Sequence, residues 1–228
     1  MAEIDINVNL IRTQKQMDKP IMIFGASGIG MAAYEIFRSH DLIVFGFLDD
    51  RKEMHGKEID EVLVLGNTDD DGFLKYIGQK CEAFIASDDN NERRNLVKML
   101  KERRKVMPVN AVHKNASLAN SASISHGNFI DDGAVLGARV VIGNHNLIHA
   151  GAILGYDVKI HNFIQIGAGA VINAGVTISD GVFIGPGAIV VSGISIGKNS
   201  RIGAGSVVIE PVEDYITVFG NPAKPVHV

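Results

Sequence analysis

The stretch Gly133-Ala-Val-Leu-Gly-Ala-Arg-Val-Val-Ile-Gly-Asn144 holds two turns of a six-residue pattern that fills most of the C-terminal half of the chain. Aliphatic residues recur at this six-residue step seventeen times in succession, at Val112, Leu118, Ile124, Ile130, Leu136, Ile142, Ile148, Leu154, Ile160, Ile166, Ile172, Ile178, Ile184, Val190, Ile196, Ile202 and Val208. This period fits neither an amphipathic helix nor one alternating strand. It fits a three-sided coil of about 18 residues in which each side contributes one inward side chain.

Two other positions of the repeat agree with such a coil. Small residues often stand two positions before the aliphatic residue, at Ala116, Ala122, Ala134, Ala152, Ala170, Ala188 and Ser206. Glycine often follows the aliphatic residue, at positions 137, 143, 155, 167, 185, 197 and 203, as a tight corner would require. The sequence therefore predicts a parallel β-helix of about five to six coils, stacked about 4.8 Å apart.

The N-terminal half has a different pattern, in which short apolar runs alternate with helix-like segments. Strands are expected over 21–24, 42–48, 62–65 and 83–86, and helices over 31–38 and 93–104. This alternation predicts a parallel sheet with helical crossovers. We expect a polar arm over 1–18, a Rossmann-like domain over 19–107, the coil over 108–210 and a capping segment over 211–228.

Composition excludes several classes of protein. The 228 residues carry a net charge of −4, which offers no basic field for nucleic acid. The single Cys81 and the lack of a charged-then-apolar leader indicate a cytoplasmic protein. No apolar run approaches the roughly 20 residues that span a bilayer, so membrane insertion is not expected.

A glycine-rich turn lies between the first expected strand and helix, over Gly25-Ala-Ser-Gly-Ile-Gly30. Backbone N–H groups in such a turn can approach a phosphate, and Asp49 at the end of the next strand can accept from a ribose or a base. The domain is too short for a full dinucleotide fold, which favours a mononucleotide-type half-site. A purely structural turn and an NAD site are the alternatives.

The repeat, the Rossmann-like half before it and the closing Phe219-Gly-Asn-Pro-Ala-Lys224 together resemble the bacterial nucleotide-sugar acetyltransferases of the NeuD/PglD type. The resemblance covers nearly the whole chain from residue 20. It implies an α/β Rossmann-like domain followed by a left-handed parallel β-helix, a homotrimer, acetyl-CoA as co-substrate, and an amino or hydroxyl group of a nucleotide-linked sugar as acceptor.

The resemblance also implies which residues form the sites. The expected substrate-binding residues are Gly25, Ser27, Gly28, Ile29, Gly30, Asp49, Asp50 and Gly66. Ile29 stands where the family often has His. The expected contacts to CoA are Gln165, Ala174, Pro186, Ser192, Ala204 and Lys224. At Gln165 the family has a second His, which touches the thioester region.

The expected base of the reaction departs from the family pattern. Acyl transfer to an amine or hydroxyl needs a group that takes the acceptor proton. The family supplies a His followed by Asp or Glu, whereas this chain has Tyr156 followed by Asp157. A phenol with a pKa near 10 is a poor base at neutral pH. His149, which directly follows an inward aliphatic residue, is therefore our preferred surrogate, with Tyr156 and Asp157 as the other catalytic candidates.

A metal site is an alternative interpretation of the spacing of the histidines. His113, Asp131 and His149 fall 18 residues apart and are expected to stack in one column. Successive rungs lie too far apart for one metal to bridge them within a chain. The γ-class carbonic anhydrases hold zinc between subunits of a similar coil, but no matching triad is evident here, and no metal is expected.

Two functions remain open from the sequence. The first is an acyl-CoA-dependent sugar N- or O-acetyltransferase of glycan or polysaccharide biosynthesis. The second is a non-catalytic trimer that binds a nucleotide sugar or CoA as a scaffold or regulator. The replacements at Ile29, Tyr156 and Gln165 favour the second; the intact repeat and glycine turn favour the first.

Overall fold

The computed structural model describes residues 19–226, so the arm predicted over 1–18 lies outside the described residues. The described chain forms two compact units that divide between Lys114 and Asn115. The short strand β6 (Ala111–Val112) lies just before this division, although it belongs to one of the three sheets of the coil.

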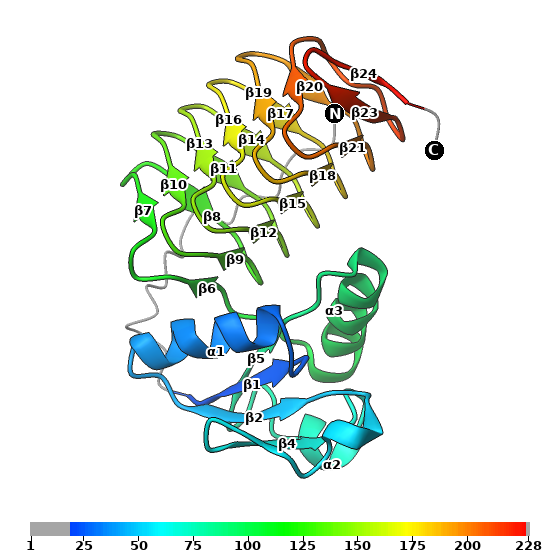
Figure 1. The fold of residues 1–228 in the computed structure, drawn as a ribbon. Coiled ribbons are helices and arrows are strands. Elements are labelled where there is room, and N and C mark those ends of the chain that lie inside the picture. Colours follow the sequence, from blue (N-terminus) through cyan, green and yellow to red (C-terminus); the bar gives the residue numbers. More distant parts are fainter. Residues whose placement is uncertain (1–18, 227–228) are drawn as a thin grey trace. The chain divides into compact units, whose positions relative to one another are not determined.

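The N-terminal unit contains a five-stranded sheet in the order β3-β4-β2-β1-β5 (Figure 1). Its strands are β1 (Ile21–Phe24), β2 (Val44–Leu48), β3 (Glu58–Ile59), β4 (Val62–Gly66) and β5 (Glu82–Ile85). Strands β1, β2, β4 and β5 pair in parallel, as predicted. The two-residue β3 pairs antiparallel with β4 and was not predicted, because two residues are too few to show a period.

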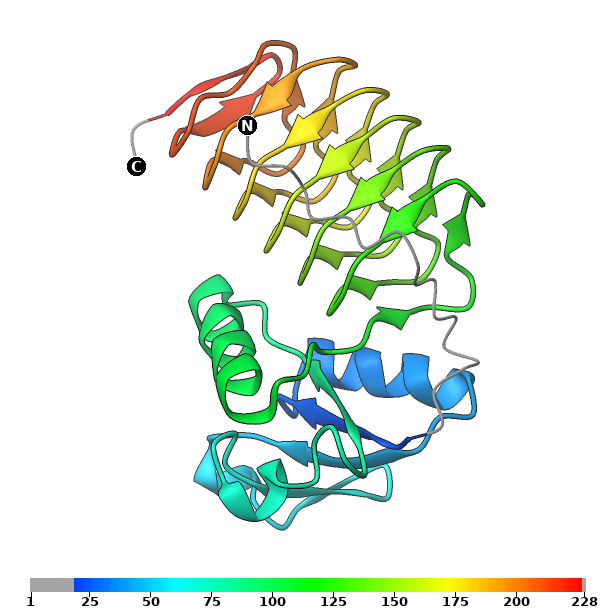
Figure 2. The same cartoon turned by 180° about the vertical axis from the view of Figure 1, so that it is seen from behind.

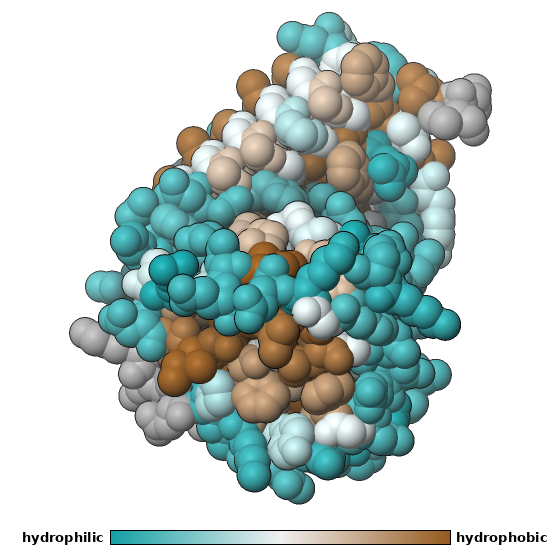
Figure 3. All heavy atoms as spheres, turned by 60° about the horizontal axis from the view of Figure 1, so that its bottom comes forward, coloured by the Kyte–Doolittle hydropathy of each residue, from teal (hydrophilic) through white to brown (hydrophobic). Residues whose placement is uncertain are grey.

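The helices of this unit are α1 (Ile29–Ser39), α2 (Asp71–Leu74) and α3 (Asn90–Arg104), with a 3-10 turn at Lys52–Met54. Helix α3 begins where the side chain of Asp89 accepts hydrogen bonds from the first turn, which is an ordinary N-cap. All four residues of β1 are fully buried, and the strand therefore forms the centre of this core. Figure 3 shows apolar side chains at the surface of this unit. The exposed large apolar residues of the unit include Ile43, Phe45 and Leu63.

The C-terminal unit is the predicted three-sided parallel β-helix (Figures 1 and 2). The first face holds β9 (Phe129–Ile130), β12 (Leu147–Ile148), β15 (Gln165–Ile166), β18 (Phe183–Ile184) and β21 (Arg201–Ile202). The second face holds β7 (Ser117–Leu118), β10 (Val135–Leu136), β13 (Ile153–Leu154), β16 (Val171–Ile172), β19 (Ile189–Val190) and β22 (Val207–Val208). The third face holds β8 (Ser123–Ile124), β11 (Val141–Ile142), β14 (Lys159–Ile160), β17 (Thr177–Ile178) and β20 (Ser195–Ile196).

The repeated aliphatic residues line the inside of this coil. Residues from Ile130 to Val208 in the six-residue series are at most 2% exposed, whereas Val112, Leu118 and Ile124 are only half-buried at the start of the coil. Strands on one face pair in register 18 residues apart, for example Leu136 with Leu154. The fold class predicted from the sequence is confirmed.

Glycines occupy two positions of the repeat, for two different reasons. The left-handed backbone position lies three residues after each aliphatic from Ile124 to Ile202, for example at Gly187 with φ +66. The glycine directly after the aliphatic is needed because coils approach closely there. A Cβ on Gly185 would lie 2.5 Å from the backbone nitrogen of Ala204 in the next coil. These glycines thus stand where each strand ends and the corner begins, and the close approach of backbones there is the physical reason for glycine.

The chain beyond Pro211 closes the last coil. Val212 bridges to Ile196, and β23 (Thr217–Gly220) continues the first face beside β21. Strand β24 (Ala223–Pro225) then folds back antiparallel to β23. This arrangement covers the exposed edge of the last coil, which a solenoid needs in order to avoid pairing with other chains.

Candidate functional site

A pocket of about 370 Å³ opens at the carboxyl ends of the parallel strands of the N-terminal unit. Its lining comes from the residues that follow β1, β2, β4 and β5: Gly25, Ser27, Gly28, Ile29, Asp49, Asp50, Arg51, Thr68, Ala86, Ser87, Asp88 and Glu92. Open α/β sheets bind ligands at this edge, because the loops there diverge around the point where the strand order reverses.

The glycine-rich turn forms the start of α1 at one side of this pocket. Gly25 has φ +107, and a Cβ on it would lie 2.6 Å from the carbonyl oxygen of Ala86. Gly28 is the N-cap with φ 50, and no side chain caps the helix. The backbone N–H groups of Ser27, Gly28 and Ile29 donate to no acceptor within the described chain. The turn therefore presents free donors at a helix N-terminus, an arrangement suited to an anion.

Asp49 is buried between this turn and Arg51. One carboxylate oxygen, Oδ2, accepts from the backbone N–H of Ala26 at 2.9 Å and from Nη2 of Arg51 at 2.8 Å. The other, Oδ1, accepts from Nε of Arg51 at 2.8 Å. Hydrogen bonding from Arg51 lowers the pKa of Asp49 from 3.8 to about 2, so the carboxylate is ionised at neutral pH.

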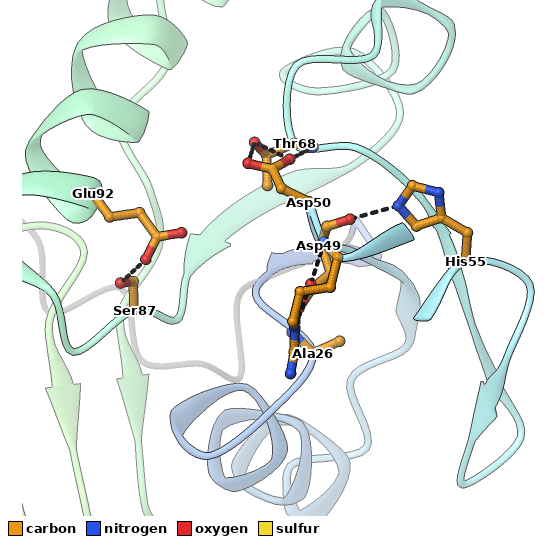
Figure 4. A network of polar contacts seen from close by, with 8 residues as sticks. Ala26, Asp49, Asp50, His55, Thr68, Ser87 and Glu92 are labelled. Atoms are coloured by element: carbon orange, nitrogen blue, oxygen red, sulfur yellow. Dashed lines mark hydrogen bonds and ion pairs between the residues drawn. The ribbon is translucent and has the colours of Figure 1, made fainter. Parts of the chain in front are cut away.

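The remaining walls of the pocket are rich in acceptors (Figure 4). Asp50 accepts from the backbone N–H of Thr68 at 2.8 Å and from its hydroxyl at 2.9 Å. Across the pocket Ser87 donates its hydroxyl to Glu92. These contacts hold two carboxylates at the pocket surface, where they can accept from hydroxyl or N–H groups of a ligand.

A buried guanidinium supports the wall that Ser87 forms. Arg93 is fully buried and donates to the carbonyl of Ser87 at 2.6 Å and to the side chain of Asn90. Burial lowers the pKa of Arg93 to about 10, which leaves it charged at neutral pH. A buried charge is retained only where hydrogen bonds satisfy it, so Arg93 fixes the start of α3 against β5.

The structure brings most of the predicted substrate-binding residues together. Gly25, Ser27, Gly28, Ile29, Asp49 and Asp50 all line the pocket. Gly30 and Gly66 do not. A Cβ on Gly30 would collide with the carbonyl of Gly25, and the carbonyl of Gly66 accepts from the N–H of Asp49. Both residues thus shape the turns that form the pocket.

Sequence reasoning missed the other half of the lining, namely Arg51, Thr68, Ala86, Ser87, Asp88 and Glu92. The order of strands and helices along the chain could have indicated these residues. Each of these residues follows a parallel strand or begins the next helix, and the carboxyl ends of parallel strands share one edge. Only the pairing order of the strands decides which of those ends are neighbours.

In the coil, Asp157 interacts with an arginine of the preceding coil. Its carboxylate accepts from Nε and Nη2 of Arg139, both at 2.6 Å, and this hydrogen bonding lowers the pKa of Asp157. Tyr156 beside it is 59% exposed. The carboxylate is therefore occupied by Arg139, and no hydrogen bond joins it to Tyr156 among the described contacts.

His149 and Gln165 lie together on the coil. The side-chain nitrogen Nε2 of Gln165 is 3.2 Å from Nε2 of His149, and the imidazole also packs 6.0 Å from the ring of Phe129. Both polar side chains are half-buried. The structure thus pairs the preferred surrogate base with the residue predicted to contact the cofactor.

The candidates of the coil fall on two different edges of the prism. Tyr156, Ala174 and Ser192 lie in turns that lead from the second face to the third, whereas His149, Pro186 and Ala204 lie in turns that lead from the first face to the second. A single chain therefore does not gather these six residues at one place.

Two further expectations concern Lys224 and the metal site. Lys224 lies on β24, and its ammonium nitrogen is 3.8 Å from the carboxylate of Glu210. Within residues 19–226 there is no group of three or more His, Cys, Asp or Glu residues that is placed to hold a metal ion. In the same part of the chain no helix is long and apolar enough to cross a membrane.

Comparison with known proteins agrees with both units. Residues 20–100 match the family model of the PglD N-terminal domain, and residues 175–210 match the bacterial transferase hexapeptide repeat. None of the curated protein sequences compared with the chain matches it.

Solved structures match over nearly the whole chain. PerB from Caulobacter crescentus, in complex with CoA and GDP-perosamine, is 25% identical with a TM-score of 0.84, covering 92% of this chain and 99% of that one. The acetyltransferase domain of PglB from Neisseria gonorrhoeae, in complex with acetyl-CoA, is 23% identical with a TM-score of 0.82, covering 91% and 99%. WeeI from Acinetobacter baumannii is 22% identical with a TM-score of 0.76, covering 91% and 100%.

The chain is thus similar to a PglD N-terminal domain over its first unit and to a bacterial transferase hexapeptide repeat over part of its second. The predicted resemblance to the NeuD/PglD-type sugar acetyltransferases is confirmed, since both of its halves match in one chain and in the expected order.

Proposed function

We propose that this protein is an acetyltransferase that moves an acyl group from acetyl-CoA to an amino or hydroxyl group of a nucleotide-linked sugar in glycan or polysaccharide biosynthesis. The observation that carries the proposal is the pocket at the PglD-type domain of a chain that also contains a hexapeptide coil. PerB, a similar protein of the same two-domain extent, was crystallised with CoA and a nucleotide sugar.

The N-terminal pocket binds the nucleotide in this proposal. Free N–H groups of the turn from Ser27 to Ile29 take a phosphate, and carboxylates such as Asp50 and Glu92 accept from hydroxyl or N–H groups of the nucleoside or the sugar. In this proposal the acceptor group of the sugar lies outside the pocket.

His149 is the base that takes the proton of the acceptor. Its hydrogen bond with Gln165 fixes the ring, and an imidazole is partly unprotonated at neutral pH. A flip of the Gln165 side-chain amide exchanges its nitrogen and oxygen, and this orientation decides whether Nε2 of His149 accepts or donates in the bond. The base role proposed for His149 requires the orientation in which Nε2 donates to the amide oxygen, because the other ring nitrogen is then unprotonated.

The trimer expected from the resemblance fits two features of the coil. Exterior aliphatic residues form a column along the second face, at Val135, Ile153, Val171, Ile189 and Val207, and three of these are 38% to 42% exposed. Such a column favours burial against another chain. The CoA and catalytic candidates also lie on two edges of one prism, and adjacent subunits would bring the two edges together.

A coupled thiol-release assay tests the proposal. The full chain is incubated with acetyl-CoA and a panel of nucleotide-linked amino sugars, and free CoA is followed. We expect turnover with at least one acceptor, and a loss of about 100- to 10,000-fold in kcat for His149→Asn. The matched control is Lys159→Ala, which changes an exposed residue of the third face. Asn144→Ala is not a suitable control, because the side chain of Asn144 forms a hydrogen-bonded ladder with Asn162.

The alternative is a non-catalytic scaffold, and the occupation of Asp157 by Arg139 beside an exposed Tyr156 is the observation that favours it. A non-catalytic scaffold would bind CoA and a nucleotide sugar measurably but would release no thiol with any acceptor. That combination of results would replace the proposal with the alternative.

A further inference from the structure

An apolar patch is exposed at the amino ends of two neighbouring strands in the N-terminal unit. Ile43 lies directly before β2, Phe45 lies in β2 and Leu63 lies in β4, and their exposed fractions are 71%, 43% and 44%. The ring of Phe45 packs 6.0 Å from that of Tyr76, which extends the patch. We call these four residues the amino-end patch. Apolar side chains that cluster at a surface, unlike single ones, mark an interaction site.

The fold explains why this end of the sheet is open. Helices α2 and α3 contribute Leu74, Leu96 and Leu100 to one core cluster. The same cluster contains Phe24 and Leu48, which are the last residues of β1 and β2. Helix α2 has only four residues, so it is about 6 Å long and cannot extend to the amino ends of the strands. The apolar layer formed by the described helices therefore lies over the carboxyl end of this face.

A β-bulge contributes to the patch. In the pairing of β1 with β2, Ile21 lies opposite Val44 and Met22 lies opposite Gly46, so Phe45 is the extra residue of β2. A bulge of this kind re-aims the side chain of the extra residue. The phenyl ring thereby reaches the aromatic ring that follows α2. The exposure of Phe45 thus follows from the pairing of the strands.

The chain enters this unit beside the amino-end patch. The backbone N–H of Ile21 donates to the carbonyl of Ile43 at 2.8 Å. The ammonium group of Lys19, the first described residue, donates to the carbonyl of Gly78 at 3.0 Å, two residues beyond Tyr76. Residues 1–18, which lie outside the described residues, are therefore joined to the unit at the edge of the patch.

The segment before this entry point has the sequence pattern of a strand with one apolar side. Over residues 4–10, aliphatic residues alternate with Asp and Asn: Ile4, Asp5, Ile6, Asn7, Val8, Asn9 and Leu10. This alternation is typical of a half-buried strand, which needs an apolar surface on one side. The eight residues 11–18 can span up to about 26 to 29 Å. That length is sufficient to return over strands that lie about 4.8 Å apart.

Size and charge favour this segment as the occupant of the patch. A stable interface between two proteins takes about 20 to 30 residues from each partner, far more than this patch offers. The exposed Lys75 and Lys80 flank Tyr76, with their ammonium nitrogens 5.1 and 5.5 Å from the centre of the ring. The segment carries Glu3 and Asp5 at its start, which are complementary in charge to these lysines.

We propose that residues 4–10 dock on the amino-end patch of their own chain. The aliphatic side of the segment packs against Ile43, Phe45 and Leu63, and its Asp and Asn side faces water. The segment thereby adds the apolar layer that α2 is too short to provide. This inference is independent of the proposed function, because the patch and the pocket lie at opposite ends of the strands.

A single tryptophan tests the proposal, because the chain contains none. Leu63→Trp and, in a separate protein, Ile43→Trp place the probe on the amino-end patch of the full chain. Fluorescence emission and quenching by acrylamide report how far the probe is exposed to water. Changing Ile6 and Val8 together to Asn should shift the emission to longer wavelength. The same change should raise the quenching constant by at least about twofold, because Asn is costly to bury against an apolar surface.

The alternation in the segment supplies a matched control. Changing Asn7 and Asn9 together to Ala alters the opposite side of the same strand, and should leave emission and quenching unchanged. Deletion of residues 1–11 should have the same effect as the paired change of Ile6 and Val8. Two probe positions keep the test decisive if one of the tryptophans disturbs the sheet.

Three results would overturn the proposal. The first is equal quenching with and without residues 1–11 at both probe positions. The second is an effect of the Asn7 and Asn9 pair as large as that of Ile6 and Val8, since contact would then not be one-sided. The third is protection of a probe chain that lacks residues 1–11, either when it is co-expressed with the unaltered chain or as its own concentration rises. Protection of that kind would assign the cover to another copy of the protein.

Discussion

Asp157 is bound by Arg139, which stands 18 residues earlier and therefore directly beneath it in the preceding coil, through two hydrogen bonds of 2.6 Å. The carboxylate is thus engaged before any substrate arrives. Because Arg139 hydrogen-bonds the charged form, the pKa of Asp157 is lowered, which makes it a weaker base than an ordinary aspartate.

The first prediction concerns this carboxylate. Asp157→Asn should keep turnover within about threefold of the unaltered protein, since removal of a group that acts in proton transfer would cost about 100-fold or more. The measurement is kcat in the thiol-release assay. A loss of two orders of magnitude would instead make Asp157 part of the catalytic machinery.

Tyr156→His restores the residue that the resembled family has at this place. We expect kcat to rise, because an imidazole accepts a proton at neutral pH far more readily than a phenol. The rise should be larger in the double variant with Arg139→Gln, which frees Asp157 to orient the new imidazole. An unchanged kcat in both variants would show that the acceptor does not reach this edge of the coil.

Gln165→Leu distinguishes two roles for one side chain. If Gln165 orients His149, through the 3.2 Å contact seen here, the substitution lowers kcat by about 10-fold and leaves the KM for acetyl-CoA nearly unchanged. If Gln165 instead contacts the cofactor, as the resemblance implies, the KM rises. Initial rates over a range of acetyl-CoA concentrations separate the two, and Lys159→Leu on the exposed third face is the control.

Two neighbouring glycines test the close approach of the coils. Gly185→Ala places a methyl group 2.5 Å from the backbone of Ala204 and should lower the free energy of unfolding by about 2 to 3 kcal/mol. Gly187→Ala meets no atom within 4 Å but keeps a left-handed φ of +66, which should cost about 1 kcal/mol. Urea unfolding of both variants measures the difference, and equal losses would contradict the explanation.

The Asp49–Arg51 pair makes stability depend on acid pH. The pKa of Asp49 falls from 3.8 to about 2 on folding, so the stabilisation is complete above the unfolded value and is lost as the pH falls toward 2. This contribution is about 2 kcal/mol. The free-energy difference between the unaltered protein and Asp49→Asn, measured by urea unfolding, should therefore shrink by about that amount between pH 6 and pH 2. A difference that stays constant with pH would show that the pair is not formed in solution.

The sequence by itself determined the architecture of this protein. A strict six-residue aliphatic period has one geometric solution, a prism with inward side chains, and residues from Ile130 to Val208 in the series are buried accordingly. The parallel strands of the N-terminal unit and the position of the glycine-rich turn also followed from local patterns. These features are encoded by side chains that lie close together in the chain.

Only the tertiary structure decided which polar groups meet. Arg51 reaches the pocket because Asp49 at the end of β2 lies against Ala26 after β1, and Glu92 faces it because β5 is the other neighbour of β1. Arg139 reaches Asp157, and Gln165 reaches His149, because coils stack 18 residues apart. Local periodicity sets which way a side chain points, but the partner of a charged group depends on strand order and stacking, which residues far apart in the sequence determine together.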